Sequence, residues 1–290
     1  MKHGFIKLNH IELDVVVAGD GPVLLLLHGF PEFWYSWRHQ IKSLSRQFTV
    51  VVPDLRGYGQ SAKPAAVEAY DQDVLVSDLL ALKQYYSPGS DIFIMGHDWG
   101  AALGYLFCTK YPKLVSRFVA LSFPHPKDFK YLLRSNGSQM WRSWYIFFFQ
   151  IPLLPELFLS IGNFFLLRRI VYKGWSGSPD AVSSRVWDRY IAHIRTHRFL
   201  RTAIHYYRAI FRHTSDGSQF PPVAVPTLAL FGEKDRLASS ALLRLTENSH
   251  HYYSASFEFR MIPGAGHWLQ QEKPEMISNL AKDFFCRPTA

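Results

Sequence analysis

An aspartate stands where a nucleophile is expected in the segment Gly96-His97-Asp98-Trp99-Gly100. The frame is Gly-x-Ser-x-Gly, in which a sharp strand-to-helix turn presents a serine hydroxyl for attack. A carboxylate there, with an ordinary pKa of about 3.9, is already ionised at neutral pH and needs no base before it attacks. It can displace a leaving group from a saturated carbon and form an alkyl ester. That chemistry suits epoxides and alkyl halides rather than esters or amides.

Two later residues complete a triad in the order nucleophile, acid, histidine. Asp235 in FGEKD follows the apolar run TLALF, and His267 in PGAGHW follows the run EFRMI. Both positions come after predicted strands, where open α/β sheets build their sites. Glu233, two residues before Asp235, is the alternative acid. His267, oriented by the acid, would deprotonate the water that hydrolyses the ester.

An oxyanion hole is predicted from backbone N–H groups. One is that of Trp99, the residue after the nucleophile, and the other belongs to Phe30 in the loop HGFPE. Gly29 permits a sharp turn there, and a cis peptide bond before Pro31 would fix the loop. We expect Phe30, Pro31 and Trp99 to contact the substrate as well, and His28 to hold the loop in place.

The elements that must position these residues alternate between short apolar runs and longer helical patterns. This alternation predicts βαβ units and a mostly parallel central sheet flanked by helices, an α/β fold. We predict a helix over residues 101–110 after the Asp98 turn and a closing helix over 274–285. The predicted strands are 23–27, 49–52, 91–95, 117–121, 227–231 and 258–262.

The segment 124–220 differs from the rest because it is helical, rich in aromatic residues and basic. Residues 123–220 contain 14 lysines and arginines against five acidic residues, which accounts for the whole formal charge of +9. We interpret 124–220 as an inserted helical cap over a core made of 1–123 and 221–290. A solvated lid exterior is the favoured explanation of the charge, and attraction of anionic amphiphiles or a membrane surface is the alternative. No nucleic-acid-binding motif accompanies the charge.

The longest apolar stretch, 143–167, is interrupted by Pro152, Pro155 and Glu156 and holds no uncharged run long enough to cross a membrane. It is better explained as an internal helical pair, and peripheral membrane contact is left open. The two cysteines, Cys108 and Cys286, form no disulfide framework. With no apolar leader at the N-terminus, we expect a reducing, cytoplasmic location. No metal-ligand cluster and no dinucleotide or phosphate-binding motif is found, so we expect no metal and no cofactor.

The motifs HGFPE, DLRGYGQS, GHDWGA, GEKD and GAGHW, in this order, resemble those of the α/β-hydrolase-fold epoxide hydrolases. The similarity runs over nearly the whole chain, and the cap segments YIFFFQIPLLPE and HYYRAIFR look most like the epoxide hydrolase 3 and 4 branch. That branch usually has an N-terminal membrane anchor, which this sequence does not show. The resemblance implies an α/β-hydrolase fold with a cap and hydrolysis of an epoxide by water to a vicinal diol.

The resemblance also implies two cap tyrosines that donate hydrogen bonds to the epoxide oxygen as it leaves. One precedes the FQ-P element, which selects Tyr145, and the other precedes an arginine, which selects Tyr207. A phenol, with an ordinary pKa of about 10, stays protonated and can donate. Tyr206 is the alternative for the second role.

Two other functions stay open. A haloalkane dehalogenase uses the same aspartate and a following tryptophan, but usually has asparagine where this chain has Phe30. A ligand-binding protein that has lost catalysis is the third reading, because fold does not imply function. The complete set of nucleophile, acid, histidine, oxyanion loop and tyrosines favours the epoxide hydrolase. The sequence does not reveal which epoxide is the substrate, nor the oligomeric state.

Overall fold

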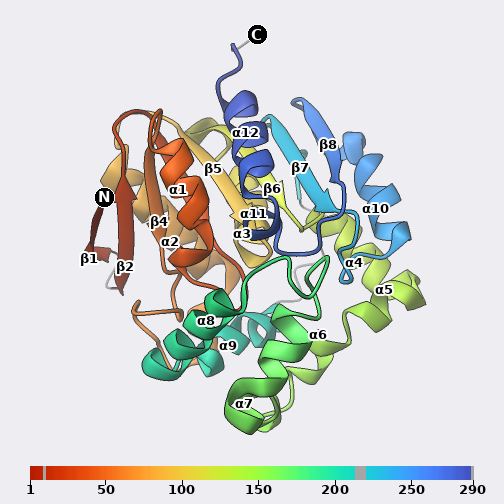
Figure 1. The fold of residues 1–290 in the computed structure, drawn as a ribbon. Coiled ribbons are helices and arrows are strands. Elements are labelled where there is room, and N and C mark those ends of the chain that lie inside the picture. Colours follow the sequence, from red (N-terminus) through yellow and green to blue (C-terminus); the bar gives the residue numbers. More distant parts are fainter. Residues whose placement is uncertain (9–10, 213–219, 289–290) are drawn as a thin grey trace.

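Eight strands form the centre of the computed structural model, which describes residues 1–8, 11–212 and 220–288. Their order in the sheet is β1-β2-β4-β3-β5-β6-β7-β8 (Figure 1). Strand β2 pairs antiparallel with β1 and β4, and all other neighbours are parallel. The mostly parallel sheet is therefore confirmed. The strands are β1 Lys2–Leu8, β2 Ile11–Ala18, β3 Val23–Leu27, β4 Thr49–Pro53, β5 Ile92–His97, β6 Val115–Leu121, β7 Thr227–Gly232 and β8 Phe257–Ile262.

Helices cover both faces of the sheet, which explains the uninterrupted apolar run of β3. Side chains alternate along a strand, so Leu25 and Leu27 join one apolar cluster, and Leu24 and Leu26 join the other. The first cluster contains residues of α2 and α3, and the second contains residues of α1 and α12. The core's helices are η1 Trp34–Trp37, α1 Arg38–Leu44, η2 Val67–Tyr70, α2 Gln72–Tyr86, α3 Trp99–Lys110, η3 Pro112–Leu114, α10 Ser240–Glu247, η5 Ser249–Tyr252, α11 Leu269–Glu272 and α12 Pro274–Phe285.

The hairpin of β1 and β2 is the part of the sheet that the sequence patterns did not predict. Nearly all of β1 is exposed, so its sequence carries no apolar run or clean alternation. The run of β2 includes Asp14, a residue depleted in strands, although here its side chain is buried. The six predicted strands are all present, with ends that differ by a few residues.

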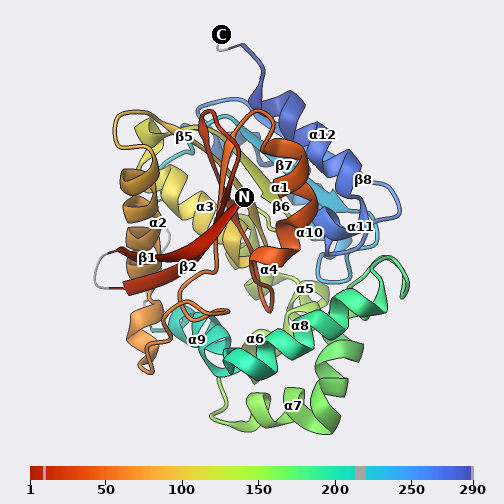
Figure 2. The ribbon, with the colours of Figure 1, turned by 60° about the vertical axis from the view of Figure 1, so that its left-hand side comes forward.

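The segment between β6 and β7 is helical, as predicted, and Figures 1 and 2 show α6 to α9 below the edge of the sheet. We keep the name cap for residues 124–220, of which 213–219 lie outside the described residues. The stretch 143–167 forms a helical pair, α6 and α7, but many of its apolar side chains are exposed rather than internal. Within the described ranges, no helix is long and apolar enough to span a bilayer. The cap helices are α4 Pro126–Ser135, α5 Gly137–Arg142, α6 Trp144–Phe148, α7 Leu154–Leu166, η4 Leu167–Tyr172, α8 Ser184–His197 and α9 Leu200–Ile210.

Candidate active site

Asp98 lies on the turn between β5 and α3, with a backbone φ of 51°. A non-glycine residue rarely adopts positive φ, and such strain is typical of functional turns. The turn is tight enough that a Cβ at Gly100 would lie 2.0 Å from the carbonyl oxygen of Leu27. The second glycine of the motif is therefore required by the close approach of α3 to β3, and the turn holds the Asp98 carboxylate at the carboxyl edge of the sheet.

The loop after β3 provides the first contact of this carboxylate. The Phe30 N–H donates to Asp98 Oδ1 at 2.8 Å. A Cβ at Gly29 would lie 2.4 Å from the Asp98 Cβ, so only glycine lets the loop come this close. The Phe30–Pro31 peptide bond is cis, as expected. Trp99 begins α3, and the amide of a first helical residue has no acceptor within the helix.

His267 and Asp235 meet as the sequence order predicts. His267 Nδ1 lies 3.0 Å from Asp235 Oδ2, and His267 Nε2 lies 3.7 Å from Asp98 Oδ2. Asp235 and His267 are both buried. Glu233, the alternative acid, is exposed and accepts from the Gly264 N–H at 2.8 Å. The geometry therefore favours Asp235 as the carboxylate that orients His267.

The charges around His267 shift its pKa, and its Nε2 is free to take a proton. Burial lowers the pKa of His267, but the charges of Asp235 and then of Asp98 and Glu32 raise it more, so the net shift is upward from 6.5. His267 Nε2 is buried and has no hydrogen-bond partner among the described residues. A buried nitrogen without a partner beside a carboxylate leaves a place for a reacting water.

Tyr145 and Tyr207 come from α6 and α9 and face each other above Asp98. Their ring centroids are 5.8 Å apart, and the Tyr207 ring is 5.1 Å from that of Trp99. Both tyrosines line the same cavity as Asp98 and His267. The Tyr206 hydroxyl instead donates to the Arg56 carbonyl at 2.7 Å, which turns this alternative away from Asp98.

Both cap tyrosines keep their protons at neutral pH. Burial, together with the negative charge of Asp98, raises the pKa of Tyr145 and of Tyr207 well above the ordinary value of 10. A protonated phenol in a site of low polarity can donate to an oxygen that gains negative charge. The pair is thus suited to hold a leaving oxygen opposite the Asp98 carboxylate.

The cavity that contains these groups has a volume of about 750 Å³. Asp98, Trp99, Tyr145, Tyr207, Asp235 and His267 line it, and most of the remaining wall is apolar. Pro31 and the Phe30 side chain are buried behind it, where the Pro31 carbonyl accepts from the Tyr172 hydroxyl at 2.9 Å. Substrate contact by Pro31 and the Phe30 ring therefore stays a prediction. Within the described parts of the chain, no cluster of side chains could hold a metal ion.

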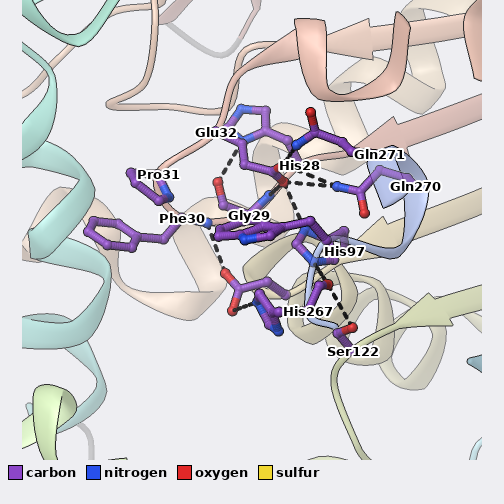
Figure 3. Close-up of polar contacts among 12 residues, drawn as sticks. His28, Gly29, Phe30, Pro31, Glu32, His97, Ser122, His267, Gln270 and Gln271 are labelled. Carbon is purple, nitrogen blue, oxygen red and sulfur yellow. Dashed lines mark hydrogen bonds and ion pairs between the residues drawn. The ribbon is translucent and has the colours of Figure 1, made fainter. Parts of the chain in front are cut away.

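A buried polar network behind the site was not anticipated from the sequence (Figure 3). The Glu32 carboxylate accepts from the Gly29 amide at 3.3 Å, lies 2.8 Å from His97 Nδ1, and is reached by the side-chain amides of Gln270 and Gln271. Burial would raise the pKa of Glu32, but His97, then His28 and the Gly29 amide, lower it below 4.5. Glu32 is therefore ionised in the interior.

The other ring nitrogen of His97 connects this network to His267. His97 Nε2 lies 2.9 Å from the His267 carbonyl oxygen, which also accepts from Ser122 Oγ at 2.9 Å. A carbonyl oxygen can only accept, so His97 Nε2 donates to it. His97 thus links Glu32 to the backbone of His267 and fixes that backbone from behind.

The only sequence signal for Glu32 and His97 is that they lie next to the motifs of the site. Glu32 closes the motif HGFPE and His97 precedes the nucleophile, but the contact between them joins the loop after β3 to the end of β5. His28 behaves as expected: its Nδ1 lies 3.0 Å from the Gly29 carbonyl oxygen, and its Nε2 accepts from the Leu55 N–H at 3.0 Å. This pattern fixes one neutral tautomer and holds the loop.

Comparison with known proteins agrees with this geometry. The family model described as alpha/beta hydrolase fold matches residues 22–274. Epoxide hydrolase 3 of Xenopus tropicalis is 33% identical over 98% of this chain and 77% of its own length. Epoxide hydrolase 4 of Homo sapiens is 33% identical over 98% of this chain and 78% of its own.

Solved structures give the same result. The crystal structure of Bacillus megaterium epoxide hydrolase in complex with an inhibitor has a TM-score of 0.86 to this chain, with 29% identity over 98% of this chain and 100% of that one. The likeness therefore includes the cap as well as the sheet. The chain belongs to the alpha/beta hydrolase fold family and, within it, to the epoxide hydrolases.

Proposed function

We propose that this enzyme converts an epoxide and water to a vicinal diol through a covalent ester on Asp98. One observation carries the proposal: a carboxylate held by the Phe30 amide has His267 on one side and two protonated tyrosines in the same cavity. Residues 124–220 would act as the lid that brings the tyrosines to the nucleophile. The epoxide hydrolases of similar sequence support the same activity.

In the first step, Asp98 Oδ2 attacks a carbon of the epoxide ring while Oδ1 stays on the Phe30 N–H. The ring carbon–oxygen bond breaks, and the departing oxygen takes a proton from Tyr145 or Tyr207. The product is an ester between Asp98 and the opened substrate, with one free hydroxyl. The largest reduction of the barrier comes from donors that are already placed where negative charge develops.

In the second step, His267 Nε2 takes a proton from water, and the hydroxide attacks Cγ of Asp98. Negative charge on Oδ1 is stabilised by the N–H groups of Phe30 and Trp99. The bond between Cγ and Oδ2 then breaks, and His267 returns its proton to the departing oxygen. The diol leaves with an oxygen from Asp98, and the second proton of the water restores the tyrosine.

A single turnover in water labelled with heavy oxygen tests this route, with enzyme in excess over a simple aryl epoxide. Unlabelled diol and label on the Asp98 peptide are expected, because the water oxygen stays on Cγ. Labelled diol would mean direct hydration and would remove Asp98 from the nucleophilic role. If no diol forms but halide is released from a haloalkane, the result would instead support a dehalogenase. If neither diol nor halide is formed, a ligand-binding protein would be favoured.

Replacing Tyr207 and Tyr206 one at a time tests which of these adjacent tyrosines donates to the epoxide oxygen. Tyr207→Phe should slow ester formation by about 10²–10³-fold, the usual effect of removing one donor from developing negative charge. Tyr206→Phe is the matched control: it loses the bond to the Arg56 carbonyl, should cost about 1 kcal/mol of stability, and should leave the rate of ester formation nearly unchanged. Stopped-flow measurement of ester formation checks both, and equal rates for the two variants would argue against Tyr207.

The pH dependence of ester hydrolysis follows from the charges around His267. As a base His267 must be neutral, so the rate should rise with pH. Because the resting enzyme raises the pKa of His267 above 6.5, His267 of the free protein should titrate above that value. Ester formation removes the charge of Asp98, one of the causes of the upward shift. The rate of ester hydrolysis should therefore rise at a lower pH than the pH at which His267 of the free enzyme titrates, as measured by NMR.

Asp235→Asn should move the rise further down in pH, since it removes the largest charge that raises the pKa of His267. It should also lower the plateau rate by about 10²–10⁴-fold, because His267 loses its orienting partner. Glu233→Gln is the control, since Glu233 is exposed and bonded to Gly264. An unchanged profile in Asp235→Asn would argue against this carboxylate as the partner of His267.

A further inference from the structure

The cap exposes an unusual concentration of apolar side chains. Seventeen large apolar side chains are exposed in the described residues, and ten of them lie within residues 140–165. We call these ten the outer cap surface: Met140, Trp141, Trp144, Phe147, Ile151, Leu153, Leu154, Leu157, Ile161 and Phe165. Single exposed apolar residues are normal, but a large apolar patch on a protein marks a contact with something else.

Helical spacing gathers three of these side chains on one side of α7. Leu154, Leu157 and Ile161 of α7 are spaced by three and four residues and are exposed, whereas Pro155 and Leu159 of the same helix are buried. The helix is therefore apolar on both faces, a property of helices that are covered on both sides.

Charged groups are almost absent from this part of the cap. Between Met140 and Phe165 the charged residues are Arg142 and Glu156, and the Glu156 carboxylate forms an ion pair with Arg208 at 2.8 Å, where both side chains are largely buried. Two tryptophans belong to the outer cap surface, and Trp141 is 78% exposed. Tryptophan is the residue type that prefers the boundary between water and lipid.

The part of the outer cap surface on α7 lies at one end of the molecule, and the part on α6 adjoins the lining of the active-site cavity. Figures 1 and 2 both show α7 at the end of the molecule opposite the C-terminus. Phe211 lines the cavity, is 49% exposed, and has its ring 5.9 Å from that of Phe147. Apolar surface thus continues from α6 to the cavity.

Basic residues border this apolar surface. Arg195 donates to the Asn163 side chain on α7, and Arg168 and Arg169 lie within three residues of the end of α7, with Arg168 paired to Asp188 at 2.7 Å. Arg134, which lines the cavity, lies on the helix before α5 and is exposed. An apolar face with a basic border complements the headgroup and acyl regions of an anionic bilayer.

A second copy of the chain would fit this surface less well. A two-fold contact would place the outer cap surface against itself. Each cap carries the whole excess of +9, so such a contact would also bring two basic borders together. The charge therefore favours an anionic partner.

We propose that the outer cap surface docks the enzyme on the surface of an anionic lipid bilayer, with α6 and α7 at the headgroup–acyl boundary. Binding itself does not depend on the reaction assigned above. If the proposed function holds, the continuity through Phe211 lets an apolar epoxide pass from the lipid into the cavity.

Flotation with vesicles tests the docking. We expect the wild-type chain to bind phosphatidylcholine vesicles containing about 30% phosphatidylserine, and to bind at least about ten-fold more weakly to phosphatidylcholine alone or in about 0.5 M NaCl. Leu154→Glu/Leu157→Glu should reduce binding to the anionic vesicles at least about ten-fold. Brominated acyl chains should quench tryptophan fluorescence of the bound wild type, because Trp141 and Trp144 enter the boundary.

Met276→Glu is the matched control, since Met276 is 45% exposed on α12, far from α7 (Figure 1). It should bind like the wild type, and both variants should hydrolyse a water-soluble epoxide normally, which shows that they fold. Absence of wild-type binding, full binding by Leu154→Glu/Leu157→Glu, or binding without quenching would each overturn the proposal. So would a wild-type dimer that the double variant converts to monomer, since the surface would then belong to a second copy.

Discussion

Asp98→Ala is expected to abolish diol formation, with a loss of at least about 10⁴-fold in turnover. The residue left behind has no oxygen that can form the ester, and neither His267 nor the tyrosines can replace it. The Phe30 amide loses its acceptor at 2.8 Å, and a water that takes the place of the carboxylate can satisfy it. Product formation from an aryl epoxide, followed by chromatography, measures the loss.

A measurement of folding is the control for this substitution. Removal of one carboxylate from a strained turn should leave the sheet intact, so the thermal unfolding midpoint should stay close to that of the wild type. Incubation with epoxide should add no mass to the protein. Substantial residual diol from folded Asp98→Ala would show that water attacks the epoxide directly and that Asp98 has another role.

His267→Gln should stop the reaction halfway. Ester formation does not need the base, because the Asp98 carboxylate is already ionised and the tyrosines supply the proton. Ester hydrolysis does need it, and glutamine cannot accept a proton from water. We expect steady-state turnover to fall by about 10³-fold or more while the protein gains the mass of one substrate molecule.

Mass spectrometry of the intact protein and of the Asp98 peptide checks this result. His250→Gln is a suitable control, since His250 is exposed and lies outside the cavity wall; it should turn over normally and carry no adduct at the end of the reaction. If His267→Gln loses activity without accumulating an adduct, His267 is required before the ester forms. The two substitutions thus separate the two halves of the proposed mechanism.

In the proposed mechanism, the buried pair of Glu32 and His97 would hold His267 in position for the second step. The His267 carbonyl receives hydrogen bonds from His97 Nε2 and Ser122 Oγ, while its ring faces Asp235 and Asp98. The loop is thus held from both sides, and the imidazole can move little between its two partners. Positioning of this kind is worth several orders of magnitude in rate when reacting groups must meet at bonding distance.

The sequence by itself determined the fold class and predicted the elbow and the order of the proposed triad. These features depend on local patterns: apolar runs of strand length, glycines at a sharp turn, and polar residues placed just after strands. The same patterns could not choose between Asp235 and Glu233 or between Tyr207 and Tyr206, because each pair lies on a single loop or helix. A side chain's direction within such a pair depends on what packs against it.

Only the tertiary structure distinguishes the two members of each pair, and for a physical reason. The Glu233 carboxylate accepts from the Gly264 amide, and the Tyr206 hydroxyl donates to the Arg56 carbonyl. Both hydrogen bonds join segments that are distant in sequence. The contact of Glu32 with His97 and the exposure of the apolar residues on α7 are likewise long-range results. Apolar periodicity shows that a face will be covered, but not whether the cover is the protein's own core or something outside it.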